Sequence, residues 1–167
     1  MRHEGCGKPV PMQPVSSSEH QQDSPSRGRR LLIVEDEIST IFAMREFFSF
    51  NGYHVDCAAG ATDAMVLLDR GSYDVVITDL HLTPHRCAEG MNVLTRARRL
   101  NPGATIVMLT AYASEGSEQE AYRNGVNLYE TKPVPLAKLA ACIEGARSDG
   151  KMHPVKSGGE WGRPCPE

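Results

Sequence analysis

Carboxylate side chains directly follow two apolar runs of the sequence. Glu35 and Asp36 come after LLIV at 31–34, and Asp79 comes after DVVIT at 74–78. Aspartate at the end of a strand is often only a turn former, so the chemistry depends on whether these side chains meet. Three carboxylates at one place repel one another unless a cation lies among them, and hard oxygen ligands suit Mg²⁺. Together the three residues predict a Mg²⁺ site.

A hydroxyl and an ammonium group follow two later apolar runs. Thr110 ends ATIVMLT at 104–110, and Lys132 comes shortly after VNLYE at 126–130. Beside a metal ion, such donors hold a phosphoryl group and stabilise its charge during transfer. Alone, Thr110 would be a β-branched strand residue and Lys132 a surface lysine. With the three carboxylates, they predict phosphoryl transfer to a carboxylate.

Five apolar, strand-like runs alternate with segments of helical pattern. The runs mostly lack strict apolar–polar alternation, which is typical of strands in a sheet covered on both faces. The predicted strands are 31–34, 53–59, 74–78, 104–110 and 126–130. The predicted helices run from about 38 to 50, 61 to 70, 89 to 100, 114 to 124 and 135 to 147.

This (βα)5 alternation predicts an α/β fold with a doubly wound, five-stranded parallel sheet. Strand–helix–strand crossovers are right-handed and leave the strands parallel. All carboxyl ends then face one edge, where open α/β sheets bind ligands. That edge brings Asp79, Thr110 and Lys132 together with the acidic pair.

Composition limits the class of protein. The chain has 167 residues, of which 40% are hydrophobic, enough for one domain with a core. A net charge of -3 gives no basic footprint, so nucleic-acid binding is disfavoured. The N-terminus lacks the apolar stretch of a secretory signal, and no window approaches the roughly 18 apolar residues of a membrane span. We therefore expect a cytoplasmic protein without membrane contact.

Both ends of the chain carry clusters of Gly, Pro and Ser. Residues 1–29 and 148–167 offer too little apolar surface to offset the entropy of ordering. We expect a disordered N-terminal arm and a disordered C-terminal tail around one domain at 30–147. The segment after 147 is too short to fold, so we expect no output domain.

Four motifs, LLIVEDE, DVVITDL, IVMLTAY and YETKPV, occur in this order. The set resembles the CheY-like receiver domain of two-component response regulators, over about residues 30–147. The resemblance implies a flavodoxin/CheY-like three-layer sandwich. It also implies a single-domain response regulator that accepts a phosphoryl group on Asp79 from a sensor histidine kinase or a histidine phosphotransfer protein.

The resemblance implies a role for each residue at this edge. Glu35 and Asp36 match the acidic pair that, with Asp79 and the main-chain carbonyl of His81, binds Mg²⁺. The side chain of His81 either shields the site from water or is a solvated loop histidine.

Four further residues match the family at the fourth and fifth strand ends. Lys132 neutralises the phosphoryl oxygens and, with Asp79, is the catalytic group of self-phosphorylation and self-dephosphorylation. Thr110 turns toward the phosphate. Tyr129 is the switch aromatic whose exposure changes with Thr110, and the peptide bond before Pro133 is cis.

Partner surfaces follow from the same resemblance. The start of the first helix meets the kinase, so we expect a partner surface around Ile38 and Ile41. The face of the fourth helix, fifth strand and fifth helix, which contains Tyr129, contacts a downstream protein target and in the family also forms homodimers.

The first helix carries more apolar residues than one buried face needs. The predicted buried stripe is Thr40, Ala43, Met44, Phe47 and Phe48, and the surplus is Ile38, Ile41, Phe42 and Phe50.

The loop after Asp79 departs from the family pattern. A proline usually stands four residues on and a glycine eight on, whereas here Thr83 takes the first position, Pro84 follows and Gly90 lies eleven residues on. The loop at 83–89 is therefore about three residues longer than usual.

Two alternatives remain open. A pseudo-receiver would bind proteins without being phosphorylated. The presence of all five key residue types disfavours it, and only the longer loop keeps it open. A haloacid-dehalogenase-type phosphatase would use the motif DLHLT at 79–83, but there the nucleophile lies on the first strand and a second aspartate replaces His81. A receiver modifies only itself, so we do not expect a conventional enzyme.

Overall fold

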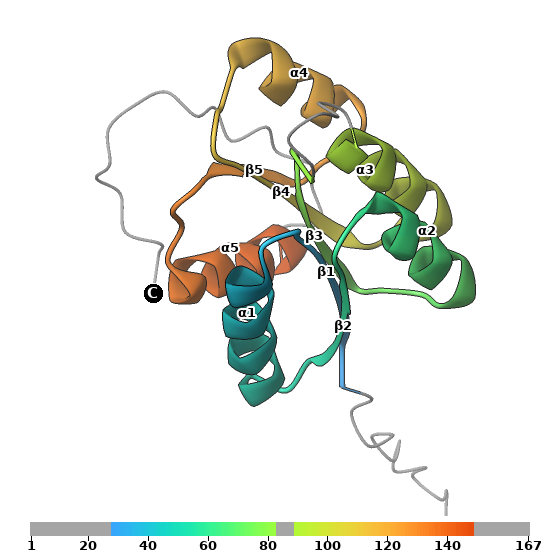
Figure 1. The fold of residues 1–167 in the computed structure, drawn as a ribbon, viewed down its shortest axis with the longest axis vertical. Helices are drawn as coiled ribbons and strands as arrows, with labels where there is room; N and C mark the ends of the chain where they lie inside the picture. Colours follow the sequence, from blue (N-terminus) through green and yellow to red (C-terminus); the bar gives the residue numbers. More distant parts are fainter. Residues whose placement is uncertain (1–27, 83–88, 149–167) are drawn as a thin grey trace, which may run out of the picture.

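The apolar runs pair into one sheet of five parallel strands with five helices (Figure 1). The computed structural model describes residues 28–82 and 89–148. The strands are β1 Arg30–Val34, β2 His54–Ala58, β3 Val75–Asp79, β4 Thr105–Thr110 and β5 Leu128–Thr131. The helices are α1 Ile38–Phe50, α2 Ala61–Arg70, α3 Glu89–Leu100, α4 Glu115–Arg123 and α5 Leu136–Ser148. The predicted alternation is confirmed, with element ends within two residues of the expected ones.

The strand order is β2-β1-β3-β4-β5. The chain moves outward from β1 to β2 on one side, then crosses back to β3 on the other. β1 and β3 are therefore neighbours, and Val34 pairs with Thr78 at their carboxyl ends. This is the switch point at which doubly wound sheets bind ligands. It places Glu35 and Asp36 beside Asp79.

Side chains on both faces of the sheet are buried. Successive strand residues point to opposite faces, so Leu31 and Ile33 pack in one cluster with Phe48 of α1 and Ile143 of α5. Leu32 and Val34 pack in the other cluster, with side chains of α2, α3 and α4. Helices cover the sheet on both sides (Figure 1). The predicted three-layer sandwich is confirmed, and its two faces explain the continuous apolar strands.

The buried stripe of α1 is the predicted one except at Ala43. Met44 and Phe48 are its buried residues, and Phe47 packs partly buried against the same cluster. Ala43, which we expected on the stripe, is exposed. Successive residues of a helix point in directions about 100° apart, so Ala43 points away from the face on which Met44 is buried. Ile41 is half-buried, whereas Ile38, Phe42 and Phe50 are exposed at 79%, 65% and 92%.

Arg29 lies at the start of β1 and attaches it to the layer of α1 and α5. Its guanidinium carbon is 5.1 Å from the centroid of the Tyr53 ring, and its Nη1 donates to Glu144 of α5 at 2.5 Å. The Tyr53 hydroxyl also donates to Glu144, at 2.6 Å.

Arg30 makes the corresponding contacts on the opposite face. Its guanidinium carbon lies 4.7 Å from the Tyr73 ring centroid, and Nη2 donates to Asp56 of β2 at 2.7 Å. The Tyr73 hydroxyl donates to the same carboxylate at 2.8 Å. Consecutive arginines reach opposite faces because side chains alternate along a strand.

Of the predicted arm (1–29) and tail (148–167), only residues 28, 29 and 148 lie within the described ranges. Within those ranges, the structure has no helix that is long and apolar enough to cross a membrane.

The two tyrosines predict an alkaline loss of stability. Burial, and the hydrogen bonds to Glu144 and Asp56, raise the pKa of Tyr53 and of Tyr73 to about 12. The contribution of each tyrosine to the free energy of unfolding is therefore fully present below the ordinary tyrosine pKa of about 10, and it is lost as pH rises toward 12. On the order of 2 kcal/mol per tyrosine should disappear over this range. In urea unfolding at pH 9 to 12, the Tyr53→Phe/Tyr73→Phe double variant should lose less stability than the native chain. If the free energy of unfolding fell equally with pH in the two proteins, the raised pKa of the two tyrosines would be contradicted.

Candidate functional site

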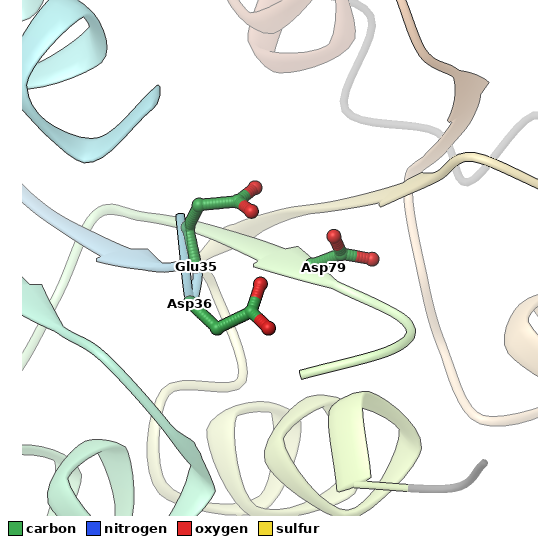
Figure 2. Close-up of side chains that lie close together, drawn as sticks. All are labelled: Glu35, Asp36 and Asp79. Atoms are coloured by element: carbon green, nitrogen blue, oxygen red, sulfur yellow. The ribbon is translucent and has the colours of Figure 1, made fainter. Parts of the chain in front are cut away.

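Three carboxylates gather beyond the carboxyl ends of β1 and β3 (Figure 2). Glu35 and Asp79 are buried, at 3% and 7% exposed, while Asp36 is exposed. One oxygen from each of the three lies within 4.8 Å of the others. The three residues that the sequence analysis grouped therefore meet.

Lys132 reaches into this cluster from the end of β5. Its Nζ donates to Glu35 Oε2 and to Asp79 Oδ2, at 2.5 Å in each case. Its backbone N–H donates to the Thr110 carbonyl at 2.8 Å, and the Lys132–Pro133 peptide bond is cis. The strand end thus fixes the backbone from which the ammonium group extends.

The charges of the cluster are only partly balanced. Burial raises the pKa of Glu35, and the hydrogen bond from Lys132 opposes that shift. Burial alone would lower the pKa of Lys132, but its bonds to Asp79 and Glu35 outweigh burial, and its pKa is raised. With all four groups ionised, three carboxylates and one ammonium leave two negative charges. A divalent cation matches that excess.

The donor set fits a hard divalent cation. Carboxylate oxygens are the ligands that Mg²⁺ and Ca²⁺ prefer. One oxygen from each of the three carboxylates lies within 4.8 Å of the others, so the three can supply ligands at one place.

His81 contacts both Asp79 and Thr110. Its backbone N–H donates to Asp79 Oδ1 at 2.9 Å, and its ring Nδ1 lies 3.4 Å from Thr110 Oγ1. Asp79 therefore receives hydrogen bonds on both oxygens, one from His81 and one from Lys132. The predicted role of the His81 carbonyl as a metal ligand stays a prediction.

Thr110 and Tyr129 are both buried. Thr110 Oγ1 accepts from the Tyr112 N–H at 3.1 Å and donates to the Tyr112 carbonyl at 3.2 Å. The Tyr129 hydroxyl lies 2.8 Å from Ser117 Oγ on α4. In this structure the Thr110 hydroxyl is held by the loop that follows β4.

Gly90 packs directly against the backbone of Asp79. A Cβ on Gly90 would lie 2.1 Å from the Asp79 carbonyl oxygen and 2.7 Å from Leu80 Cα. The Gly90 N–H also donates to the Leu80 carbonyl at 3.3 Å. This glycine, noted from the sequence only because of its displacement by the longer loop, therefore sets how closely α3 approaches Asp79. Residues 83–88 of that loop lie outside the described ranges.

Sequence reasoning missed the contact between Ser117 and Tyr129. Ser114 and Ser117 have the spacing of a capping box, and this signal was present at the predicted helix start. The eleven residues between Ser117 and Tyr129 gave no indication that their side chains meet.

Comparison with known families gives one match over most of the chain. The model described as "Response regulator receiver domain" matches residues 31–144. Among related sequences, the transcriptional regulatory protein DltR of Streptococcus agalactiae is 35% identical over 114 residues, which are 68% of this chain and 50% of DltR. An uncharacterised 14.6 kDa protein of Leptolyngbya boryana is 32% identical over 68% of this chain and 86% of its own length.

Solved structures share the fold. A CheY-like receiver domain protein of Methanospirillum hungatei has a TM-score of 0.67 and 27% identity, over 73% of this chain and 95% of that one. A response regulator of Burkholderia pseudomallei, determined with a phosphorylated aspartic acid, a calcium ion and citrate, has a TM-score of 0.65. It is 24% identical, over 72% of this chain and 69% of that one.

A side chain at Gly90 should disturb the Asp79 region. Because its Cβ would overlap backbone atoms, we expect Gly90→Ala to lower the free energy of unfolding by about 2 to 3 kcal/mol. Gly116 is the matched control, since it is likewise the second residue of its helix but has nothing within 4 Å of an added Cβ. Urea unfolding measures both variants. An equal loss of unfolding free energy on substitution of Gly90 and of Gly116 by Ala would contradict the close packing of Gly90 against the Asp79 backbone.

Removal of Lys132 should destabilise the site and strengthen cation binding. Lys132→Ala leaves Glu35 and Asp79 without their shared partner, so we expect a loss of about 2 kcal/mol without added metal. Millimolar Ca²⁺ or Mg²⁺ should then raise the thermal midpoint more in the variant than in the native chain. Lys138→Ala is the control, because Lys138 pairs with Glu130 nearer the surface, at 3.5 Å. An equal rise of the thermal midpoint on metal addition in the native chain, Lys132→Ala and Lys138→Ala would refute this charge balance.

Proposed function

The chain belongs to the family of response regulator receiver domains, and on this basis we propose that Asp79 accepts a phosphoryl group from a sensor histidine kinase or histidine phosphotransfer protein. The observation that carries the proposal is the environment of Asp79. It is a buried carboxylate with one oxygen bonded to Lys132 and the other to the His81 N–H, and a second acidic group lies exposed beside it in Asp36.

The proposed chemistry is a transfer between side chains. An Asp79 oxygen forms the new O–P bond while the P–N bond of a phosphohistidine breaks, and the leaving imidazole takes up a proton. Lys132 already lies against Asp79, so its ammonium group can balance the charge that develops on the transferring oxygens without reorganisation. Hydrolysis of the acyl phosphate restores the aspartate, so the protein modifies only itself.

We assign the three carboxylates, with the His81 carbonyl, to the binding of Mg²⁺. When bound, Mg²⁺ would neutralise oxygens of the phosphoryl group. Asp36 is the exposed member of the set and can reorient most easily to ligate an incoming ion. Glu35 and Asp79 are restrained by Lys132.

The proposed response passes through Thr110 to Tyr129. To face a phosphoryl group on Asp79, the Thr110 hydroxyl must give up its two bonds to Tyr112. A local charge change thereby biases a two-state element. The face formed by α4, β5 and α5 is the proposed contact surface for a downstream protein or for a second copy of the chain.

The exposed side of α1 is the proposed kinase surface. Ile38 and Phe42 are exposed one helical turn apart, at the end of α1 that follows the acidic pair. Ile41 is half-buried, so this contact would centre on Ile38 and Phe42 rather than on Ile38 and Ile41.

The chain spans about half the length of DltR, a transcriptional regulatory protein. We propose that the segment described here acts by protein contact rather than by binding DNA itself.

Phosphorylation of Asp79 can be measured by intact mass after incubation with acetyl phosphate. We expect a phosphate adduct in the native chain with Mg²⁺, none in Asp79→Asn, and a strongly reduced amount in Asp36→Asn. Asp63→Asn, an exposed change in the first turn of α2, should be labelled like the native chain. An adduct that persists in Asp79→Asn would contradict the proposal. A folded native chain that gives no adduct and binds no beryllofluoride would instead indicate a pseudo-receiver.

A further inference from the structure

The Tyr129 hydroxyl meets the N-terminal cap of α4. Ser114 precedes the helix, and its Oγ accepts from the Ser117 N–H at 3.1 Å. In return, the Ser114 N–H donates to Ser117 Oγ at 3.3 Å, which completes a capping box. Tyr129 reaches that same Ser117 Oγ, at 2.8 Å. One serine hydroxyl thus belongs both to the helix cap and to the surroundings of Tyr129.

This hydroxyl has more neighbours than it can bond at once. Ser117 Oγ lies within 3.3 Å of four polar atoms, namely the N, O and Oγ of Ser114 and the hydroxyl of Tyr129. A serine hydroxyl offers one proton and two lone pairs. The capping bonds therefore fix the position and orientation of the atom that Tyr129 meets. A change on either side redistributes the bonds on the other.

The first turn of α4 also borders open space. A cavity of about 160 Å³ borders this turn and is lined by His81 and Tyr112 as well as by Ser114, Ser117 and Glu120. The buried residue of α4 is Ala121, in the second half of the helix. The first turn therefore depends on its cap more than on apolar packing.

We propose that Ser117 is a positioning residue that couples the buried position of Tyr129 to the capped first turn of α4. The ring position and the cap stabilise each other, because each supplies a bonding partner to the same oxygen. Departure of Tyr129 removes a bond from the cap, and loss of the cap removes the fixed partner of Tyr129. This inference rests on the proposed function, which makes Tyr129 the switch residue, and adds that α4 responds at its N-terminus.

Nitration of tyrosines by tetranitromethane tests the coupling in the unphosphorylated protein. Peptide mass analysis gives the initial rate at Tyr129 relative to Tyr112, which is 81% exposed and serves as the internal standard. Ser117→Ala should raise this ratio about fivefold, the effect of losing one hydrogen bond of ordinary strength. Ser114→Ala should raise it by a comparable factor although Tyr129 keeps its serine partner. Ser117→Thr retains a hydroxyl and should leave the ratio near the native value.

Gln119→Gly is the matched control for helix stability. Gln119 is exposed on α4, and glycine there costs about as much helix stability as a lost cap. The ratio in this variant should stay native. An equal rise in Gln119→Gly would overturn the coupling as general loss of the helix, and so would a native ratio in Ser114→Ala or Ser117→Ala. The nitration test involves no phosphoryl group. Its outcomes can therefore be interpreted even if Asp79 is not phosphorylated.

Discussion

Lys132 donates from one half-buried ammonium group to two buried carboxylates, Glu35 and Asp79. Withdrawal of a charge from water costs several kcal/mol unless the charge is paired and hydrogen-bonded. These two carboxylates come from different strands and would repel each other without the lysine. The cluster is stable because one cation pairs with both carboxylates, and the two negative charges that remain match the charge of a divalent ion.

The sheet supplies the geometry that this charge balance requires. β1 and β3 are adjacent at the switch point, so Glu35 and Asp79 lie side by side. Lys132 comes from the far side of β4 and is held through its backbone bond to Thr110. Gly90 lets α3 approach the Asp79 backbone despite the longer loop. Lys132 and Glu35 are 97 residues apart in the sequence, so their ion pair forms only when the strands that carry them have assembled into the sheet.

Much of this arrangement was predictable from the sequence, because parallel strands must end at one edge. The positions of Asp79 and Lys132 at the ends of apolar runs predicted the contact between their side chains. The exposure of Ala43 was not predicted, since the near-continuous apolar residues of α1 fit several buried stripes.

Contacts that depend on exact approach could not be predicted either. Gly90 gave only a spacing, and the packing of α3 onto Asp79 depends on the backbone path. The bond between Ser117 and Tyr129 joins two elements whose separation is set by tertiary packing.

The most direct test of the central claim is to locate the phosphorylated residue. After incubation with acetyl phosphate and Mg²⁺, reduction with borohydride converts an acyl phosphate to a stable alcohol, and peptide mass analysis identifies the modified residue. The account predicts modification at Asp79 alone, decreased strongly in Lys132→Ala and absent without divalent cation. Modification at Asp36 or Glu35, or undiminished labelling of Asp79 in Lys132→Ala, would contradict it.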